Sequence, residues 1–283
     1  MATAFVLAGG GSIGAVQVGM LQELLAYGVQ ADLVVGSSVG AINGAYFAGR
    51  PTLEGVHELA TIWRGLKRRE VFPLTLHSLA GALIRRSAPV DPRGLRRLLE
   101  AHLPYRDLEQ AAIPLHVVAT DVMGGGLVRL STGAAVEAVL ASCAIPGAFP
   151  PVRLGERHLV DGAVASNTPI RVALELGATR LLVLPSGYAC ALDAPPRGAV
   201  ATALHAITLL IAHQLVSDLE SARGSTQIEL ITVPPLCPLA VSPYDFSRAG
   251  ELIERAAEQT RRWLREGGLE KQRIPGALRP HED

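Results

Sequence analysis

Ser38 lies in the segment Gly36-Ser37-Ser38-Val39-Gly40, which fits the pattern G-x-S-x-G. An apolar run precedes the segment and small residues follow it, so the serine is expected at a sharp turn between a strand and a helix. The turn is crowded, and Gly36 and Gly40 supply the missing side chains that it requires. An ordinary glycine-serine turn is the alternative for this segment taken alone. The motif predicts Ser38 as a nucleophile for acyl transfer.

A glycine-rich loop, GGGSIG, contains Gly9, Gly10, Gly11 and Gly14 and follows the first apolar run. Such loops leave backbone N–H groups free to face an anion, which makes this one a candidate oxyanion hole. The same glycines satisfy G-x-G-x-x-G, the fingerprint of dinucleotide-binding proteins. A nicotinamide enzyme also carries an acidic residue near the end of its second strand, whereas this chain has its G-x-S-x-G motif there. The oxyanion hypothesis is therefore favoured.

The third motif is Asp161, which follows the apolar run at 158–160 and precedes Gly162 and Ala163. A carboxylate at this position is expected at the edge of the sheet where α/β proteins bind ligands, although aspartate before glycine also forms ordinary turns. An aspartate with a pKa near 3.9 is a weak base toward a serine hydroxyl. We therefore expect Asp161 in a semi-enclosed, apolar site, within hydrogen-bond reach of Ser38.

The eight histidines offer no third member for a Ser-His-Asp triad. Folds with this type of turn place the histidine on a loop after the acid. His205 and His213 instead fall in an apolar run, and His281 lies at the end of the chain. His158 points to the opposite face of its strand from Asp161, and the other histidines come earlier in the sequence. A two-residue catalytic unit is the prediction.

The three motifs, in this order, resemble the patatin-like phospholipase family. The segments 118–121 (VATD) and 141–152 (ASCAIPGAFPPV) strengthen the resemblance, which extends from about residue 5 to 184. It implies that Ser38 and Asp161 form a catalytic dyad, and that the backbone of Gly10, Gly11 and their neighbours Gly9 and Gly14 holds the oxyanion. It implies neither a cofactor nor a metal.

The function implied by the resemblance is a carboxylic ester hydrolase of the lipid esterase or phospholipase A type, which forms an acyl-enzyme. One departure is Ile13, because the family often has arginine or lysine at that position. The alternative is therefore a catalytically weak or silent lipid-binding or regulatory protein of the same fold. A dinucleotide-binding oxidoreductase is the less favoured third hypothesis. The expected partner is a lipid or another acyl ester.

Alternating apolar runs and helical patterns predict an α/β/α sandwich with a mostly parallel central sheet, patatin-like, in one domain over residues 1–268. A polar tail is expected at 269–283. The predicted strands span 4–8, 33–35, 115–119, 158–160, 181–184 and 228–232. One helix is predicted directly after the glycine loop. The other predicted helices span 41–48, 53–66, 92–102, 134–142, 169–176 and 248–265.

Two further apolar stretches raise the question of membrane contact. Residues 198–216 are long enough for a membrane span, but His205, His213 and Gln214 favour a buried helix. Residues 67–86 carry basic residues on both sides of an apolar run, as a lid at a lipid interface does. Pro73 and Gly81 interrupt that run, so a core-packed segment is favoured. Peripheral membrane contact stays an open alternative.

The charge balance excludes some partners: 26 basic and 26 acidic residues give a formal net charge of zero, so no nucleic-acid partner is expected. The three cysteines, Cys143, Cys190 and Cys237, are widely spaced and form no metal-ligand pattern. They are typical of a reducing compartment, and we expect a cytoplasmic protein with all three buried. The oligomeric state does not follow from the sequence.

Overall fold

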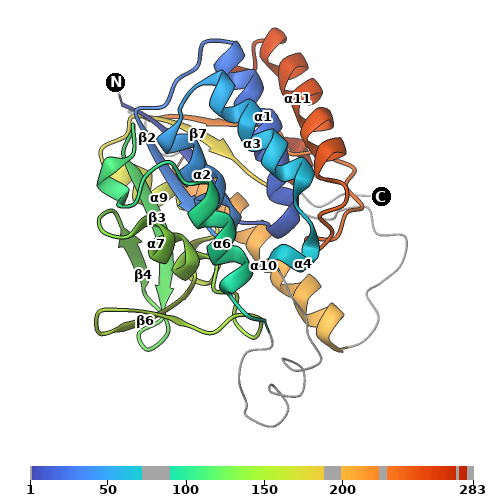
Figure 1. The fold of residues 1–283 in the computed structure, drawn as a ribbon. Helices are drawn as coiled ribbons and strands as arrows, with labels where there is room; N and C mark the ends of the chain where they lie inside the picture. The colour runs from blue at the N-terminus through green and yellow to red at the C-terminus, as the bar shows by residue number, and fades with distance from the viewer. Residues whose placement is uncertain (1, 72–89, 188–198, 223–227, 272–273, 279–283) are drawn as a thin grey trace.

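The computed structural model describes residues 2–71, 90–187, 199–222, 228–271 and 274–278 (Figure 1). In this part of the chain, eight strands form one sheet in the order β5-β6-β3-β2-β1-β7-β8, and β4 pairs with β3. Five strands are mutually parallel, and β4 and β6 run antiparallel to β3. The strands are β1 (Thr3–Leu7), β2 (Leu33–Ser37), β3 (Leu115–Asp121), β4 (Leu127–Leu130), β5 (Val152–Leu154), β6 (Arg157–Asp161), β7 (Arg180–Leu184) and β8 (Glu229–Thr232).

Helices cover both faces of the sheet. Successive residues of a strand point to opposite faces, so the buried apolar strands present side chains to both layers of helices. Phe5 and Leu7 of β1 join the larger core cluster, whereas Ala4 and Val6 join the other. The larger cluster is covered by α1 (Ala15–Ala26), α2 (Val39–Gly49), α3 (Leu53–Gly65), α6 (Arg93–His102), α7 (Ala135–Ser142) and α11 (Ala249–Arg265), and the smaller by α9 (Ile170–Glu175) and α10 (Ala199–Ala222). The predicted α/β/α sandwich is confirmed.

Each predicted strand corresponds to an observed one, with ends that agree within two residues. Two observed strands were not predicted, β4 and β5, which have four and three residues and no continuous buried run. Such short, half-exposed strands carry little periodicity, so the pattern does not reveal them.

The apolar stretch at 198–216 forms the first part of α10, but its predicted burial is wrong for much of its length. No side chain from His205 to His213 is buried, whereas Leu215 and Leu219 are. The helix therefore packs on the sheet mainly through its second half. Among the described residues, no helix has both the length and the apolar character that a membrane crossing requires.

Two smaller expectations are corrected. The segment at 269–283 is not simply a polar tail, since Ile274 and Leu278 are buried against the smaller core cluster. Cys143 is buried as expected, but Cys237 is only half-buried because it lies in a loop beside α11. Cys190 and most of the proposed lid lie outside the described residues, and the start of that lid forms α4 (Arg68–Val71).

Candidate active site

Two strands end facing each other along one edge of β3. β2 runs parallel to β3 and stops where Ser37 pairs with Val118. β6 runs in the opposite direction, and its last residue, Asp161, pairs with Ala119, the next residue along β3. β4 pairs with residues 117–120 of β3 and occupies the other edge, so β2 and β6 share this one. The strand register therefore places the residue after β2 beside the end of β6.

Ser38 and Asp161 meet at this junction. The Ser38 hydroxyl donates a hydrogen bond to Oδ2 of Asp161 over 2.7 Å, and the Ala163 amide donates to Oδ1 over 2.8 Å. Both side chains are buried, with Ser38 8% and Asp161 3% exposed. Burial raises the pKa of Asp161 to about 6, although the Ala163 amide and the Ser38 hydroxyl lower it. A base with this pKa accepts a proton from a hydroxyl near neutral pH more readily than an exposed aspartate does.

The turn that presents Ser38 is strained. Among the described residues, Ser38 is the one non-glycine residue with a positive φ, at 54°. Positive φ is costly for a residue with a side chain and is typical of the turn that presents a catalytic serine. A Cβ on Gly36 would collide with the Gly40 backbone, and a Cβ on Gly40 would collide with the Leu7 carbonyl oxygen. The two glycines are therefore required by close backbone approach.

The end of α7 connects the two halves of the site. Oγ of Ser142 accepts a hydrogen bond from the Ser38 amide over 2.9 Å and donates one to the Val118 carbonyl over 2.5 Å. The carbonyls of Ser142 and Ala144 accept hydrogen bonds from the amides of Gly162 and Asp161. One short segment thus holds both the nucleophile and the carboxylate, and the sequence analysis had recognised it only as part of the resemblance.

The glycine loop lies beside Ser38 and leads into a 3₁₀ turn, η1 (Gly11–Gly14). The Gly9 amide donates to the Asn167 carbonyl over 3.0 Å, so in this conformation it is already engaged. Gly14 lies against Val39. In the described part of the chain, the amides of Gly10 and Gly11 have no protein acceptor, as is usual before a helical turn. These two amides are the candidate donors.

A buried amide network, which the sequence analysis missed, holds the glycine loop from behind. Nε2 of Gln17 donates to the Ala8 carbonyl at one end of the loop, and Nδ2 of Asn43 donates to the Gly14 carbonyl at the other. Asn43 also donates to Oε1 of Gln17, and the Trp63 indole donates to Oδ1 of Asn43. Gln17 and Asn43 are fully buried. In the sequence, Gln17 and Asn43 are polar residues within apolar helical stretches, and this pattern could have indicated the network.

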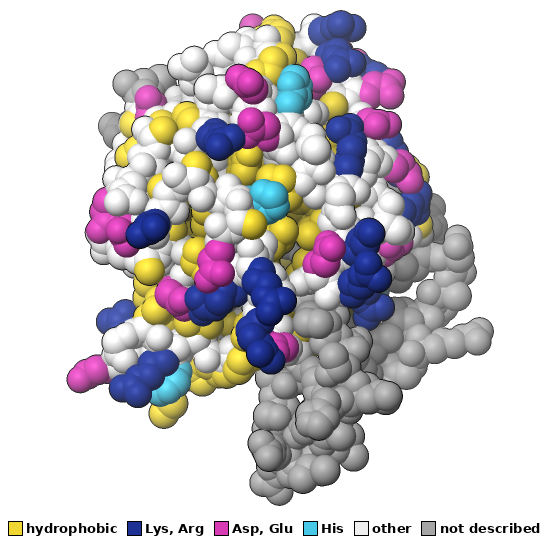
Figure 2. Space-filling view, in the orientation of Figure 1, with side chains coloured by type: hydrophobic (Ala, Val, Ile, Leu, Met, Phe, Trp, Pro, Cys, Tyr) yellow, Lys and Arg dark blue, Asp and Glu magenta, His cyan; other side chains and the backbone are white. Residues whose placement is uncertain are grey.

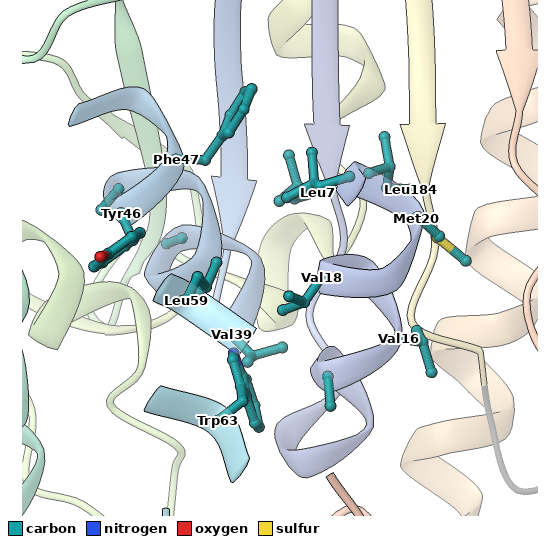
Figure 3. Close-up of a cluster of buried hydrophobic side chains, with 14 of the residues drawn as sticks. Leu7, Val16, Val18, Met20, Val39, Tyr46, Phe47, Leu59, Trp63 and Leu184 are labelled. Atoms are coloured by element: carbon teal, nitrogen blue, oxygen red, sulfur yellow. The ribbon is translucent and has the colours of Figure 1, made fainter. Parts of the chain in front are cut away.

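Two cavities open from Ser38 and share Gly11 and Ile145. The first, of about 80 Å³, is lined almost wholly by apolar side chains of α2, α3 and α6. Figure 3 shows three of them, Val39, Leu59 and Trp63, close together. The second cavity, of about 260 Å³, is lined by Asp161, by the glycine loop and by one side of α10. The site thus offers separate spaces for two parts of a substrate.

Comparison with known proteins gives a family match and several relatives. The model of the family described as patatin-like phospholipase matches residues 5–174. Patatin-like phospholipase domain-containing protein 7 of Rattus norvegicus is 27% identical over 192 residues, which cover 66% of this chain and 14% of that protein. An uncharacterized NTE family protein of Mycobacterium tuberculosis is 32% identical over 168 residues, covering 59% of this chain and 27% of that protein. The chain thus spans a minor part of the length of these relatives.

Solved structures of similar proteins include VipD from Legionella pneumophila, with a TM-score of 0.49, 15% identity and coverage of 94% of this chain and 67% of that one. Human GIVD cytosolic phospholipase A2, in complex with methyl gamma-linolenyl fluorophosphonate, has a TM-score of 0.48 and 16% identity. The match covers 98% of this chain and 59% of the phospholipase chain.

Proposed function

The chain belongs to the patatin-like phospholipase family, and from this premise we propose that it is a carboxylic ester hydrolase of the lipid esterase or phospholipase A type. The observation that carries the proposal is the 2.7 Å hydrogen bond from the Ser38 hydroxyl to the buried Asp161 carboxylate. A nucleophile needs a base in contact with its proton, and a pKa raised to about 6 suits Asp161 to that role.

In the proposed reaction, Oγ of Ser38 attacks the ester carbonyl carbon while its proton moves to Oδ2 of Asp161. The tetrahedral intermediate collapses, the carbon–oxygen bond to the alcohol breaks, and Asp161 returns the proton to the leaving alcohol. Water then attacks the acyl-enzyme and gives a proton to Asp161. The acid leaves, and the proton returns to Ser38. The Ala163 amide keeps Asp161 in place throughout.

The developing oxyanion is assigned to the amides of Gly10 and Gly11. Each preorganised donor of this kind contributes about a hundredfold or more to turnover. Ile13, which stands where the family often has a basic residue, is buried and supplies no charge. Backbone donors therefore carry the stabilisation alone in this proposal.

The two cavities support an assignment of the substrate's parts. The acyl chain occupies the apolar cavity between α2, α3 and α6, where burial of methylene groups favours binding. The alcohol portion occupies the wider cavity beside Asp161 and α10, where the leaving oxygen can take its proton. Lipid esters, which join an apolar acyl group to an alcohol portion, suit this division.

Labelling with a fluorophosphonate tests the proposal, because the reagent reacts with activated serines. Mass spectrometry is expected to map one adduct to Ser38, with none in Ser38→Ala and strongly slowed labelling in Asp161→Asn. Denatured protein serves as the control for unspecific reaction. An adduct on another residue, or equal labelling of the Asp161→Asn variant, would exclude the dyad. A folded protein that binds lipid but takes no label would instead be the silent binding protein suggested by Ile13.

A further inference from the structure

The first half of α10 presents apolar side chains to solvent. Ile207, Leu209 and Leu210 are 51%, 38% and 69% exposed, and they lie within four consecutive positions. The sequence contains no arginine, lysine, aspartate or glutamate from residue 199 to 217. The second half holds the helix in place through the buried Leu215 and Leu219. This surface is thus both apolar and uncharged, which is unusual for an exposed helix of a globular protein.

The exposed part of α10 borders the wider cavity, which Ser38 and Asp161 also line. Ile207 lines this cavity together with Ile211 of the next turn. The same cavity is lined by Val164 of α8 (Ala163–Ser166), which is 58% exposed and follows Ala163, whose amide binds Asp161. The mouth of the cavity is therefore bordered by exposed apolar side chains from two helices.

We propose that the first half of α10, with Val164, is a lipid-docking surface through which an acyl ester passes from a lipid aggregate into the site. The proposal rests on the proposed hydrolase function. A protein partner or a second copy seated on this face would also cover the cavity mouth and obstruct the substrate. A lipid surface supplies the substrate itself, and apolar side chains insert at its boundary. Because residues 199–217 of α10 include no arginine, lysine, aspartate or glutamate, docking depends on apolar burial rather than on anionic lipid.

The test uses the Ser38→Ala protein, which cannot hydrolyse the probe, and vesicles of phosphatidylcholine. Partitioning is measured by co-sedimentation for this protein, for the same protein with Leu209→Ser and Leu210→Ser, and for a control with Tyr27→Ser and Leu53→Ser. Tyr27 and Leu53 are exposed apolar residues elsewhere on the molecule. Replacing both leucines of α10 is expected to weaken partitioning about tenfold or more, whereas the control keeps its affinity.

Salt and light scattering distinguish the other possible occupants. Partitioning is expected to persist when the salt concentration is raised from about 0.05 to about 0.5 M, because uncharged surfaces are not screened. Equal partitioning of the α10 variant and the control, or loss of partitioning in salt, would overturn the proposal. A dimer that becomes monomeric on replacement of the leucines would show that a second copy covers this face, which also overturns it.

Turnover measurements separate this proposal from the proposed function. With Ser38 intact, the Leu209→Ser/Leu210→Ser protein is expected to hydrolyse a short soluble ester at the unmodified rate and vesicle lipid about tenfold more slowly. Equal rates on vesicle lipid would contradict the docking surface. Failure of the unmodified protein on both substrates would contradict the hydrolase function, while the partitioning of the Ser38→Ala protein would still decide the surface.

Discussion

Ser38 and Asp161 are 123 positions apart in the sequence, yet their side chains share a hydrogen bond. The site has no histidine between them, so the carboxylate itself must serve as base in the proposed mechanism. An exposed aspartate is too acidic for this role, and burial corrects that by destabilising the charged form. The apolar surroundings therefore take part in the chemistry by setting the basicity of Asp161.

The raised pKa of Asp161 predicts the pH dependence of the reaction. Only the carboxylate can accept the Ser38 proton, so kcat/KM on a soluble ester is expected to fall about tenfold per pH unit below about pH 6. A pH-rate profile between pH 4 and 9 measures this, at about constant ionic strength. A rate that stays constant down to about pH 4 would indicate an ordinary aspartate.

The same shift predicts a stability effect in Asp161→Asn. The pKa of Asp161 is about 6 in the folded protein, against 3.8 as the model value, so folding favours the protonated form. This contribution is fully present below pH 3.8 and is lost as the pH rises through about 6. Asparagine does not ionise, so the variant is expected to gain up to about 3 kcal/mol relative to the unmodified protein between pH 4 and 7. Urea unfolding of the variant and the unmodified protein at about pH 4 and about pH 7 measures the gain. The same difference in unfolding free energy at both pH values would contradict the prediction.

At the scale of elements, the turn between β2 and α2 depends on close contact with the end of β1. Gly40→Ala would push a methyl group into the Leu7 carbonyl, so we expect a loss of about 2 kcal/mol or more in stability and about hundredfold in kcat. Gly65→Ala is the matched control, because nothing lies within 4 Å of its added Cβ. Denaturant unfolding and soluble-ester kinetics compare the two variants. Similar effects in both would show that the close approach is unimportant.

The buried amide network connects α1, α2 and α3 to both ends of the glycine loop. Asn43→Ala removes the donor to the Gly14 carbonyl and to Oε1 of Gln17, and it removes the acceptor of the Trp63 indole. We expect kcat to fall about tenfold or more with little change in KM, because displaced loop amides would stabilise the transition state less.

A control variant separates positioning by Asn43 from general loss of stability. Leu252→Ala removes a fully buried side chain of α11, outside the network, and is expected to cost about 2–5 kcal/mol while kcat is retained. Stability and kinetics are measured for both variants under the same conditions. An equal kcat in Asn43→Ala and Leu252→Ala would show that the network stabilises the fold but does not position the glycine loop for catalysis.

At the scale of the whole molecule, positive and negative charges balance. Figure 2 shows basic and acidic side chains interspersed over the visible face, in agreement with a formal net charge of zero. Long-range electrostatic attraction therefore contributes little to partner choice. Apolar contact, through the cavities and the exposed half of α10, is what distinguishes this surface.

Two described residues after α11, Ile274 and Leu278, belong to the core of the molecule. Ile274 is 7% exposed and packs in the smaller core cluster, so Ile274→Ala is expected to cost about 2–4 kcal/mol in unfolding free energy. Glu270→Ala, at an exposed position nearby, is expected to change it by less than about 0.5 kcal/mol. Thermal or urea unfolding compares the two. A negligible effect at Ile274 would support the original expectation of a polar tail at 269–283.

The sequence by itself determined the layered fold, the strands that cross the core and the candidate residues Ser38 and Asp161. These follow from local rules: apolar residues alternate along a strand, and a strained strand-to-helix turn requires small residues at fixed spacing. Gly36 and Gly40 meet that requirement because glycine has no side chain.

Only the tertiary structure decided which groups meet. The meeting of β2 and β6 along β3, the Ser142 hydrogen bonds and the amide network all join segments far apart in the chain. The engagement of the Gly9 amide by Asn167 and the exposure of half of α10 depend equally on distant partners. Local patterns show which residues are apolar or polar, but strand register and the available packing surface determine which of them are buried and paired.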